Sequence, residues 1–253
     1  MNSKTDMKFT SNGTSLSATL YYPEGFTKDR LSPLVMMATG DGVNGSQSST
    51  WPPLISSILA INIPVFIFDF YSLGKSDGDI LGFNTTTAIT NMKDAVNLLA
   101  KINWIDKRRI GLIASSFGGA ISLLVQAELN LFKVMCLKSP VSFIPESYET
   151  ELNDNVDNWK RSGRIDGVKF AYQAYMDSAR YNVYAAAMTI DTPTLIVHGS
   201  SDTIVPLKQS IRLNCLMQNS LLVKLEGVNH GYKEPGALDN LIQQHRNFIK
   251  THI

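Results

Sequence analysis

The feature that most restricts how this chain can fold is a repeated alternation of short apolar runs with longer segments of helical spacing. Continuous apolar runs of this kind are typical of strands that a parallel sheet buries on both faces. The alternation therefore predicts an α/β fold in which a largely parallel sheet is wrapped by helices. The six runs are residues 34–40, 63–71, 108–115, 133–140, 193–199 and 220–227.

The N-terminal part of the chain has a different pattern. Residues 7–11 and 15–22 alternate polar and apolar side chains on either side of Asn12 and Gly13. Asn-Gly is a strong signal for a two-residue hairpin turn, because both residues tolerate a positive φ. These segments predict an antiparallel hairpin at one edge, which brings the expected sheet to eight strands.

Helices are expected where segments with helical spacing begin. Such segments begin near Pro52, Thr85, Phe117, Pro206 and Pro235, and Pro, Thr or Asn lies near several of these starts. In a fold of this class the helices cover both faces of the sheet.

The length of the chain and one irregular stretch define the expected domain organisation. With 253 residues, 44% of them hydrophobic, residues 1–253 are expected to form a single domain with one sizeable core. Residues 141–190 contain no convincing strand, so we expect a helical cap insertion there. Ligands bind beyond the carboxyl ends of the strands in such sheets, so the insertion could roof a site or simply cover a sheet edge. The stretch is rich in aromatic residues: Trp159, Phe170, Tyr172, Tyr175, Tyr181 and Tyr184.

The balance of charge excludes several classes of partner. A formal net charge of +1, from 23 basic and 22 acidic residues, offers no electrostatic surface for nucleic acid or an anionic membrane. The first residues lack a basic region followed by an apolar one, and no uncharged apolar stretch approaches about 18 residues. The sequence favours a cytoplasmic protein with a small-molecule partner, no nucleic acid and no membrane span, and leaves its oligomeric state open.

Cysteine and histidine usage indicates no metal and no cofactor. Cys136 and Cys215 lie in apolar stretches, and two cysteines are too few for a disulfide framework or a zinc site. We expect both to be buried free thiols. His, Asp and Glu are not clustered at metal-ligand spacing, and the glycine-rich residues 39–45 lack the spacing of a nucleotide-binding loop.

Two adjacent serines raise the question of catalysis. The sequence GLIASSFGGA, residues 111–120, places Ser115 and Ser116 between an apolar run and a glycine pair. A nucleophile on a sharp strand-to-helix turn needs small residues two positions before and after it, because the strained backbone brings those positions close to their neighbours. Ser116 has Ala114 and Gly118 there, whereas Ser115 has two large side chains. The pattern selects Ser116, although a serine at a helix start can also be a simple cap.

Two downstream residues complete a chemically sensible set. A serine hydroxyl becomes an effective nucleophile when a histidine takes its proton and a carboxylate orients that histidine. Asp202 follows the apolar run 193–199, and His230 follows the last apolar run in a glycine-flanked loop. The other three histidines lie at a strand end or in the terminal helical segment. The order Ser, Asp, His after successive strands is far more specific than any one of the residues.

Four segments together resemble the α/β-hydrolase superfamily over nearly the whole chain. They are IASSFGGA around Ser116, PTLIVHGSSDTIVP around Asp202, GVNHGY around His230, and FDFYSLGKSDG at residues 68–78. The chain is most similar to small serine esterases and acyl hydrolases, including cinnamoyl-ester hydrolases and dienelactone-hydrolase-like proteins. Ala114 departs from the superfamily pattern, which has glycine at that position.

The resemblance implies a role for each residue of the site. It implies Ser116 as nucleophile, His230 as general base and then general acid, and Asp202 as the residue that holds the imidazole tautomer. It also implies an oxyanion hole formed by the backbone N–H groups of Phe117 and Asp41.

Two residues in the matching loops need a separate interpretation. Asp41 lies in Thr39-Gly40-Asp41, where family members usually have His-Gly before the donor, and residues 39–45 could equally form a flexible surface turn. For Asp69 the resemblance implies a structural role, in which its carboxylate bonds loop amides that support the site.

The expected reaction is hydrolysis of a small-molecule carboxylic ester through an acyl-enzyme. The run GLIASS also resembles the elbow of the acyl-protein thioesterases of luminous bacteria, so a thioesterase or acyltransferase on the same triad is the alternative. A second alternative is a ligand-binding or interaction module, since some proteins of this fold have kept the architecture without catalysis.

Overall fold

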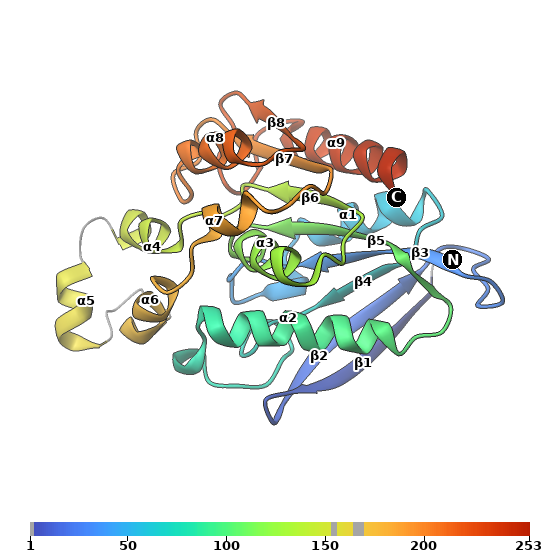
Figure 1. Cartoon of the computed structure of the whole chain (residues 1–253), viewed down its shortest axis with the longest axis horizontal. Coiled ribbons are helices and arrows are strands. Elements are labelled where there is room, and N and C mark those ends of the chain that lie inside the picture. Colours follow the sequence, from blue (N-terminus) through green and yellow to red (C-terminus); the bar gives the residue numbers. More distant parts are fainter. Residues whose placement is uncertain (1–2, 153–155, 164–169) are drawn as a thin grey trace.

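The structure, a computed structural model, describes residues 3–152, 156–163 and 170–253 (Figure 1). An eight-stranded sheet has the order β1-β2-β4-β3-β5-β6-β7-β8. The pairs β1–β2 and β2–β4 are antiparallel and the other pairs are parallel, so the predicted α/β fold and strand number are confirmed. The strands are β1 (Ser3–Ser11), β2 (Thr14–Tyr22), β3 (Ser32–Ala38), β4 (Val65–Phe68), β5 (Ile105–Ser115), β6 (Val134–Lys138), β7 (Thr194–Gly199) and β8 (Ser220–Leu225).

The predicted hairpin is confirmed at one edge of the sheet. β1 and β2 pair antiparallel along their whole length. Asn12 and Gly13 join them with φ of 47° and 78°. Positive φ at both central residues suits the right-handed twist of the two strands.

The main helices begin within two residues of the predicted starts. They are α1 (Trp51–Leu59), α2 (Thr85–Ala100), α3 (Phe117–Leu129), α8 (Leu207–Leu216) and α9 (Ala237–His252). Two short 3-10 turns, η1 (Gly45–Gln47) and η2 (Ile80–Gly82), lie in the loops after β3 and β4.

The sheet separates two apolar cores, as expected for a sheet covered on both faces. Along β3, Leu34, Met36 and Ala38 belong to the core that includes side chains of α2 and α3. Val35 and Met37 belong to the core that includes side chains of α1 and α9. Successive side chains of a strand point to opposite faces, so every central strand contributes to both cores.

The segment between β6 and β7 is helical where the structure describes it. It contains α4 (Ile144–Leu152), α5 (Val156–Ser162), α6 (Tyr172–Ser178) and α7 (Val183–Ala187), and no described residue of 141–190 is in a strand. Figure 1 shows α4, α5 and α6 at the end of the sheet opposite both chain termini.

The aromatic residues of this segment pack mainly on one another. The Trp159 ring lies 5.6 Å from the Tyr172 ring, with its indole N–H donating to the Phe170 carbonyl. Phe170 stacks on Phe83 at 5.0 Å, and Phe83 contacts Phe117 at 5.4 Å. These rings continue the core under α2 and α3 through Phe83 and Phe117, which favours the covering role for the aromatic residues.

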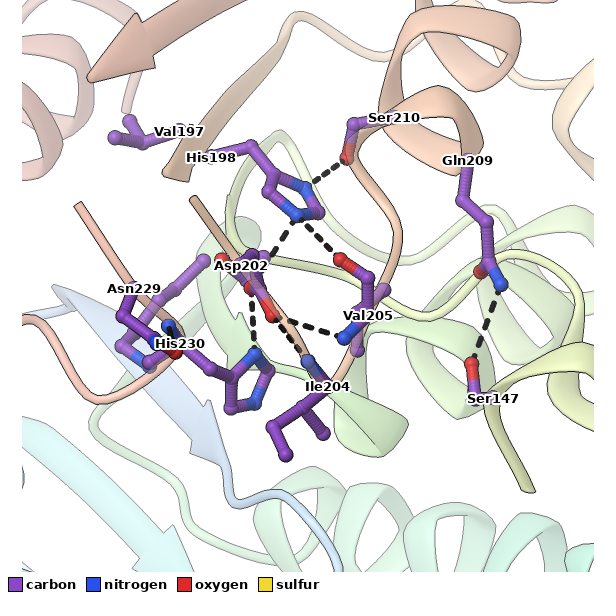
Figure 2. A network of polar contacts seen from close by, with 12 residues as sticks. Ser147, Val197, His198, Asp202, Ile204, Val205, Gln209, Ser210, Asn229 and His230 are labelled. Carbon is purple, nitrogen blue, oxygen red and sulfur yellow. Dashed lines mark hydrogen bonds and ion pairs between the residues drawn. The ribbon is translucent and has the colours of Figure 1, made fainter. Parts of the chain in front are cut away.

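Two polar side chains attach the helices between β6 and β7 to the rest of the fold. Gln209 of α8 is buried; its carbonyl accepts from the N–H of Ser142 at 2.7 Å, and its amide donates to Ser147 Oγ at 3.2 Å (Figure 2). Asp177 of α6 accepts from the N–H and hydroxyl of Thr86, at 2.8 and 2.6 Å. The segment is therefore attached both near its start and at α6.

Both cysteines are free, but only one is buried. Cys136 lies in β6 between the sheet and α9, whereas Cys215 is exposed, so the prediction for Cys215 was wrong. The reason is helical geometry: Leu213 and Met217 face the core, and the side chain between them points to the opposite side of α8. In the described residues, every helix is too short or too polar to cross a lipid bilayer.

Asp69, directly after β4, ties two loops together. Its buried carboxylate accepts from the backbone N–H of Ser46 at 2.6 Å and of Lys75 at 3.0 Å, and from the Ser46 hydroxyl at 3.0 Å. Gly45 and Gly74 enclose it so closely that a Cβ on either would lie 2.3 Å from a carboxylate atom. The loop-amide bonds that the resemblance implied for Asp69 are therefore present.

The substitution Asp69→Asn tests this support. The amide offers one acceptor oxygen in place of two, so a buried N–H loses its partner and the free energy of unfolding should fall by about 1–3 kcal/mol. Urea unfolding measures this. Asp79→Asn is the matched control: Asp79 is exposed and caps η2 through the N–H of Leu81, and asparagine caps equally well. Wild-type stability of Asp69→Asn would contradict the role.

Candidate active site

Ser116 occupies a strained turn between β5 and α3. Its φ of 53° and ψ of −124° lie in a region that residues other than glycine rarely adopt. Backbone bonds hold it there: its N–H donates to the Lys138 carbonyl at 3.0 Å, and its carbonyl accepts from Val141 at 3.0 Å and Gly119 at 2.9 Å. This is the local geometry of a strand–nucleophile–helix elbow, which lifts the serine side chain above the carboxyl edge of the sheet.

The small residues around Ser116 differ in how strictly they are required. A Cβ at Gly118 would lie 2.1 Å from the carbonyl oxygen of Thr39, so α3 can approach β3 only with glycine there. Ala114 is fully buried in the core that α2 and α3 cover, beside Ala38 and Leu137 on the adjacent strands. A methyl group is thus accommodated at position 114, where the superfamily pattern has glycine.

Asp202 and His230 are in direct contact. His230 Nδ1 lies 2.7 Å from Asp202 Oδ2 (Figure 2). Because a carboxylate only accepts, Nδ1 carries the ring proton and Nε2 keeps its lone pair. Figure 2 shows this second nitrogen pointing away from Asp202. The histidine is therefore held in the tautomer that can take a proton from a hydroxyl.

The Asp202 carboxylate is surrounded by donors. Oδ1 accepts from the N–H groups of Ile204 at 3.0 Å and Val205 at 2.9 Å. Burial by itself raises the pKa of this carboxyl. Hydrogen bonds from His198, His230 and the Val205 N–H lower it by more, so the pKa of Asp202 lies well below the usual range. Asp202 is thus stabilised as an anion.

His198 is a part of this site that the sequence did not reveal. It is fully buried at the end of β7, with Nε2 3.3 Å from Asp202 Oδ2 and 3.0 Å from the Val205 carbonyl (Figure 2). Both neighbours are acceptors, so Nε2 carries a proton, and Nδ1 lies 2.7 Å from the Ser210 hydroxyl. A histidine four residues before a candidate acid was the available signal.

Ser116 and His230 line the same cavity, of about 500 Å³, at the carboxyl end of the sheet. The Ser115 side chain reaches this cavity as well. Among the described residues, no hydrogen bond joins Ser116 Oγ to His230. Contacts between a nucleophile and its base are often long in the free protein and tighten when substrate binds. The three residues selected from the sequence thus gather at one edge, with Asp202 and His230 already in contact.

The two candidate oxyanion donors flank Ser116. Phe117 is the first residue of α3, so its N–H has no partner within the helix and lies at the positive end of the helix dipole. Gly40 approaches the elbow so closely that a Cβ on it would lie 3.2 Å from Ser116 Cβ, and the next residue, Asp41, lines the cavity. The loop after β3 is therefore part of the wall of the site.

Lys138 was also missed. It is the last residue of β6, paired in register with Ser115, and it is 7% exposed at the cavity wall. Its Nζ donates to the His230 carbonyl at 2.9 Å and lies 4.6 Å from the centre of the Tyr232 ring. A lysine inside an otherwise apolar run was the signal. Within the described part of the chain, no three His, Cys, Asp or Glu side chains gather as a metal site would require.

Gly118→Ala tests the close approach of α3 to β3. The new methyl would overlap the Thr39 carbonyl, so the free energy of unfolding should fall by about 1–3 kcal/mol. Urea titrations measure this change. Gly42→Ala is the control, because nothing lies within 4 Å of its added Cβ, and it should stay within about 0.5 kcal/mol of wild type. Equal stability of the two variants would refute the packing argument.

Asp202→Asn tests the anionic state of the acid. A carboxyl whose folded pKa is depressed contributes stability above its unfolded pKa near 4, and this contribution is lost as the pH falls. The stability gap between wild type and variant should therefore narrow below about pH 4, by roughly 1 kcal/mol per pH unit. Urea midpoints between pH 6 and pH 3 give the gap. A gap that stays constant over this range would contradict the depressed pKa.

Known proteins resemble this chain in sequence or in fold. Over 177 residues the chain is 25% identical to the uncharacterized protein YfhR of Escherichia coli O157:H7, a match that covers 69% of this chain and 55% of that protein. The chain therefore matches little more than half the length of that relative.

Solved structures match over almost the whole chain. Est1E from Butyrivibrio proteoclasticus, with ferulic acid bound, superposes with a TM-score of 0.80 at 21% identity, covering 97% of this chain and 98% of Est1E. An esterase from Pyrococcus furiosus superposes with a TM-score of 0.76 at 19% identity, covering 99% and 91% of the two chains. At these identities the matches establish the α/β-hydrolase fold.

The family model supplies the remaining comparison. The model of the prolyl oligopeptidase family matches residues 82–253, more than half of the chain, and this range includes Ser116, Asp202 and His230. By this match and by its fold, the chain belongs to the prolyl oligopeptidase family, within the α/β-hydrolase superfamily.

Proposed function

We propose that this protein is a serine hydrolase that cleaves carboxylic esters through an acyl-enzyme on Ser116. The observation that carries the proposal is the Asp202–His230 pair, joined at 2.7 Å on a cavity that the strained Ser116 also lines. A buried anion, an imidazole in the proton-accepting tautomer and a hydroxyl raised on an elbow form the set that acyl transfer needs.

The first half-reaction acylates the serine. His230 Nε2 takes the hydroxyl proton as Ser116 Oγ attacks the carbonyl carbon, and the backbone N–H groups of Phe117 and Asp41 donate to the oxyanion. The proton then passes from Nε2 to the leaving oxygen, the bond between carbonyl carbon and that oxygen breaks, and the alcohol departs. Asp202 stabilises the imidazolium that forms in between.

The second half-reaction repeats these steps with water. Water gives a proton to His230 and attacks the acyl carbon, and the oxyanion forms again between the same two amides. Ser116 Oγ leaves with the proton from Nε2, so the acid is released and the enzyme returns to its starting state.

Ser116→Ala should lower kcat for p-nitrophenyl ester hydrolysis by at least about ten-thousandfold, because it removes the attacking atom. Ser115→Ala is the matched control, since Ser115 lines the same cavity but lies in regular strand conformation, and it should keep most of the activity. Activity of Ser116→Ala close to wild type would refute the mechanism. An equal loss in both variants would leave the choice of Ser116 unsupported.

A fluorophosphonate probe separates a hydrolase from a binding module of the same fold. An adduct on Ser116 of the folded protein supports the hydrolase, and its absence favours the binding module.

The class of acyl substrate is settled by rates on matched compounds. We expect p-nitrophenyl esters to react faster than acyl thioesters of equal chain length and faster than peptide p-nitroanilides. A hundredfold preference for the thioester would instead assign the site to a thioesterase or acyltransferase.

A further inference from the structure

Ser116 borders two cavities of very different size and chemistry. The larger, of about 500 Å³, also carries His230 and Lys138 on its wall. The smaller, of about 30 Å³, lies under the first cap helix and carries Phe117 and Ile144. The two cavities share Asp41, Ser116 and Ile204 and differ in the rest of their lining. A substrate bound at Ser116 thus has two distinct regions available.

The position of His230 decides which part of an ester occupies which cavity. The leaving oxygen must come within hydrogen-bond reach of His230 Nε2, since that nitrogen returns the proton. His230 lines the large cavity and is absent from the described lining of the small one. The alcohol part of the substrate therefore belongs in the large cavity and the acyl part in the small pocket.

The small pocket suits a short, apolar acyl group. More than half of its lining residues are apolar: Phe117, Val141, Ile144, Ile204 and Val205. Asp41, Ser116, Ser147 and Tyr148 complete the described lining. A volume of about 30 Å³ favours a short acyl chain such as acetyl over a long one.

The large cavity has a mixed polar and apolar lining and carries two lysines. Hydroxyl and amide side chains line it, among them Asn44, Ser48 and Thr50. Lys138 forms its inner wall and is almost completely buried, whereas Lys233 is exposed at the rim. Asp41 is the acidic residue among the described lining residues.

The Lys138 ammonium lacks an ion-pair partner among the described residues. One of its three donors is used by the His230 carbonyl, and no described carboxylate lies within salt-bridge distance. Burial lowers the pKa of Lys138 to about 8, although the negative charge of Asp202 partly offsets this by raising it. A buried cation without a paired anion is costly, so an anionic ligand in this cavity would be strongly favoured.

The other titratable groups around Lys138 do not supply that anion. Burial raises the pKa of Tyr232 well above its usual range and lowers the pKa of His245 to about 3, so both are neutral at pH 7. His230 offers only its carbonyl oxygen. Asp202 is negative but already accepts from two amides and two imidazoles.

We propose that the substrate is the ester of a short acyl group with a polar, anionic alcohol, whose negative group binds Lys138 and Lys233 in the large cavity. The proposal rests on the proposed function, because His230 assigns the leaving-group side only if it is the general acid. The carboxylate or phosphate of the leaving group supplies the missing partner of the buried ammonium. The small pocket under α4 excludes long acyl chains.

Matched aryl acetates test the charge preference. The compounds are 4-acetoxybenzoate, which carries a negative leaving group, and 4-acetoxybenzamide, its neutral counterpart of nearly equal shape. We expect kcat/KM for the benzoate to exceed that for the benzamide by about tenfold or more at pH 7. The ratio should fall as the pH rises above about 8 and Lys138 loses its proton. A ratio near or below one at pH 7 would overturn the proposal.

Variants assign the preference to the lysines. Lys138→Met should bring the ratio close to one, and Lys233→Met should reduce it several-fold. A displaced His230 loop would slow both esters alike, so the ratio separates recognition of charge from support of the loop. Lys250→Met, on the exposed end of α9, is the control and should leave the ratio unchanged. If Lys138→Met fails to fold, Lys233→Met and the wild-type ratio still decide the question. An unchanged ratio in Lys233→Met and in any folded Lys138→Met would refute it.

The acyl side is tested with p-nitrophenyl acetate, butyrate and octanoate. We expect kcat/KM to fall steeply from acetate to octanoate, and a preference for octanoate would contradict the small pocket. Failure of the proposed function itself looks different, because then none of these esters is hydrolysed in a way that Ser116→Ala abolishes.

Discussion

The contact on which the candidate site depends is the approach of α3 to the end of β3 at Gly118. A Cβ at this position would lie 2.1 Å from the Thr39 carbonyl, so the chain can turn from β5 into α3 only where a side chain is missing. The turn places Ser116 at a positive φ, and the loop after Thr39 is pressed against it through Gly40. Elbow and candidate oxyanion loop are thus products of a single packing constraint.

Much of the fold could be predicted from the sequence, because strongly periodic segments leave little choice. Six apolar runs and a hairpin gave eight strands, and the helix starts were correct within two residues. Ser116, Asp202 and His230 were selected because the elbow needs small neighbours and the order of the three residues is specific. The structure brings Asp202 and His230 into contact and places Ser116 on the same cavity. Their catalytic roles, and those of Phe117 and Asp41, rest on the proposed mechanism.

What escaped prediction depends on which strands are neighbours. Lys138 matters because β6 lies between β5 and β7, which brings its side chain under the His230 loop, and an apolar run gives no information on strand order. His198 matters because the loop after β7 folds back over its own strand end. The exposure of Cys215 follows from the exact rotation of α8, which a partly polar helix does not define from sequence alone.

Lys138 has a mechanical consequence beyond its charge. Its carbonyl accepts from the N–H of Ser116, while its ammonium donates to the carbonyl of His230, so one residue is bonded to both sides of the reaction centre. A shift of β6 would carry the elbow and the histidine loop in the same direction and leave their separation nearly constant. The separation of the Ser116 hydroxyl from the His230 ring would therefore change little when the sheet moves, even though the two residues lie more than a hundred positions apart in the chain.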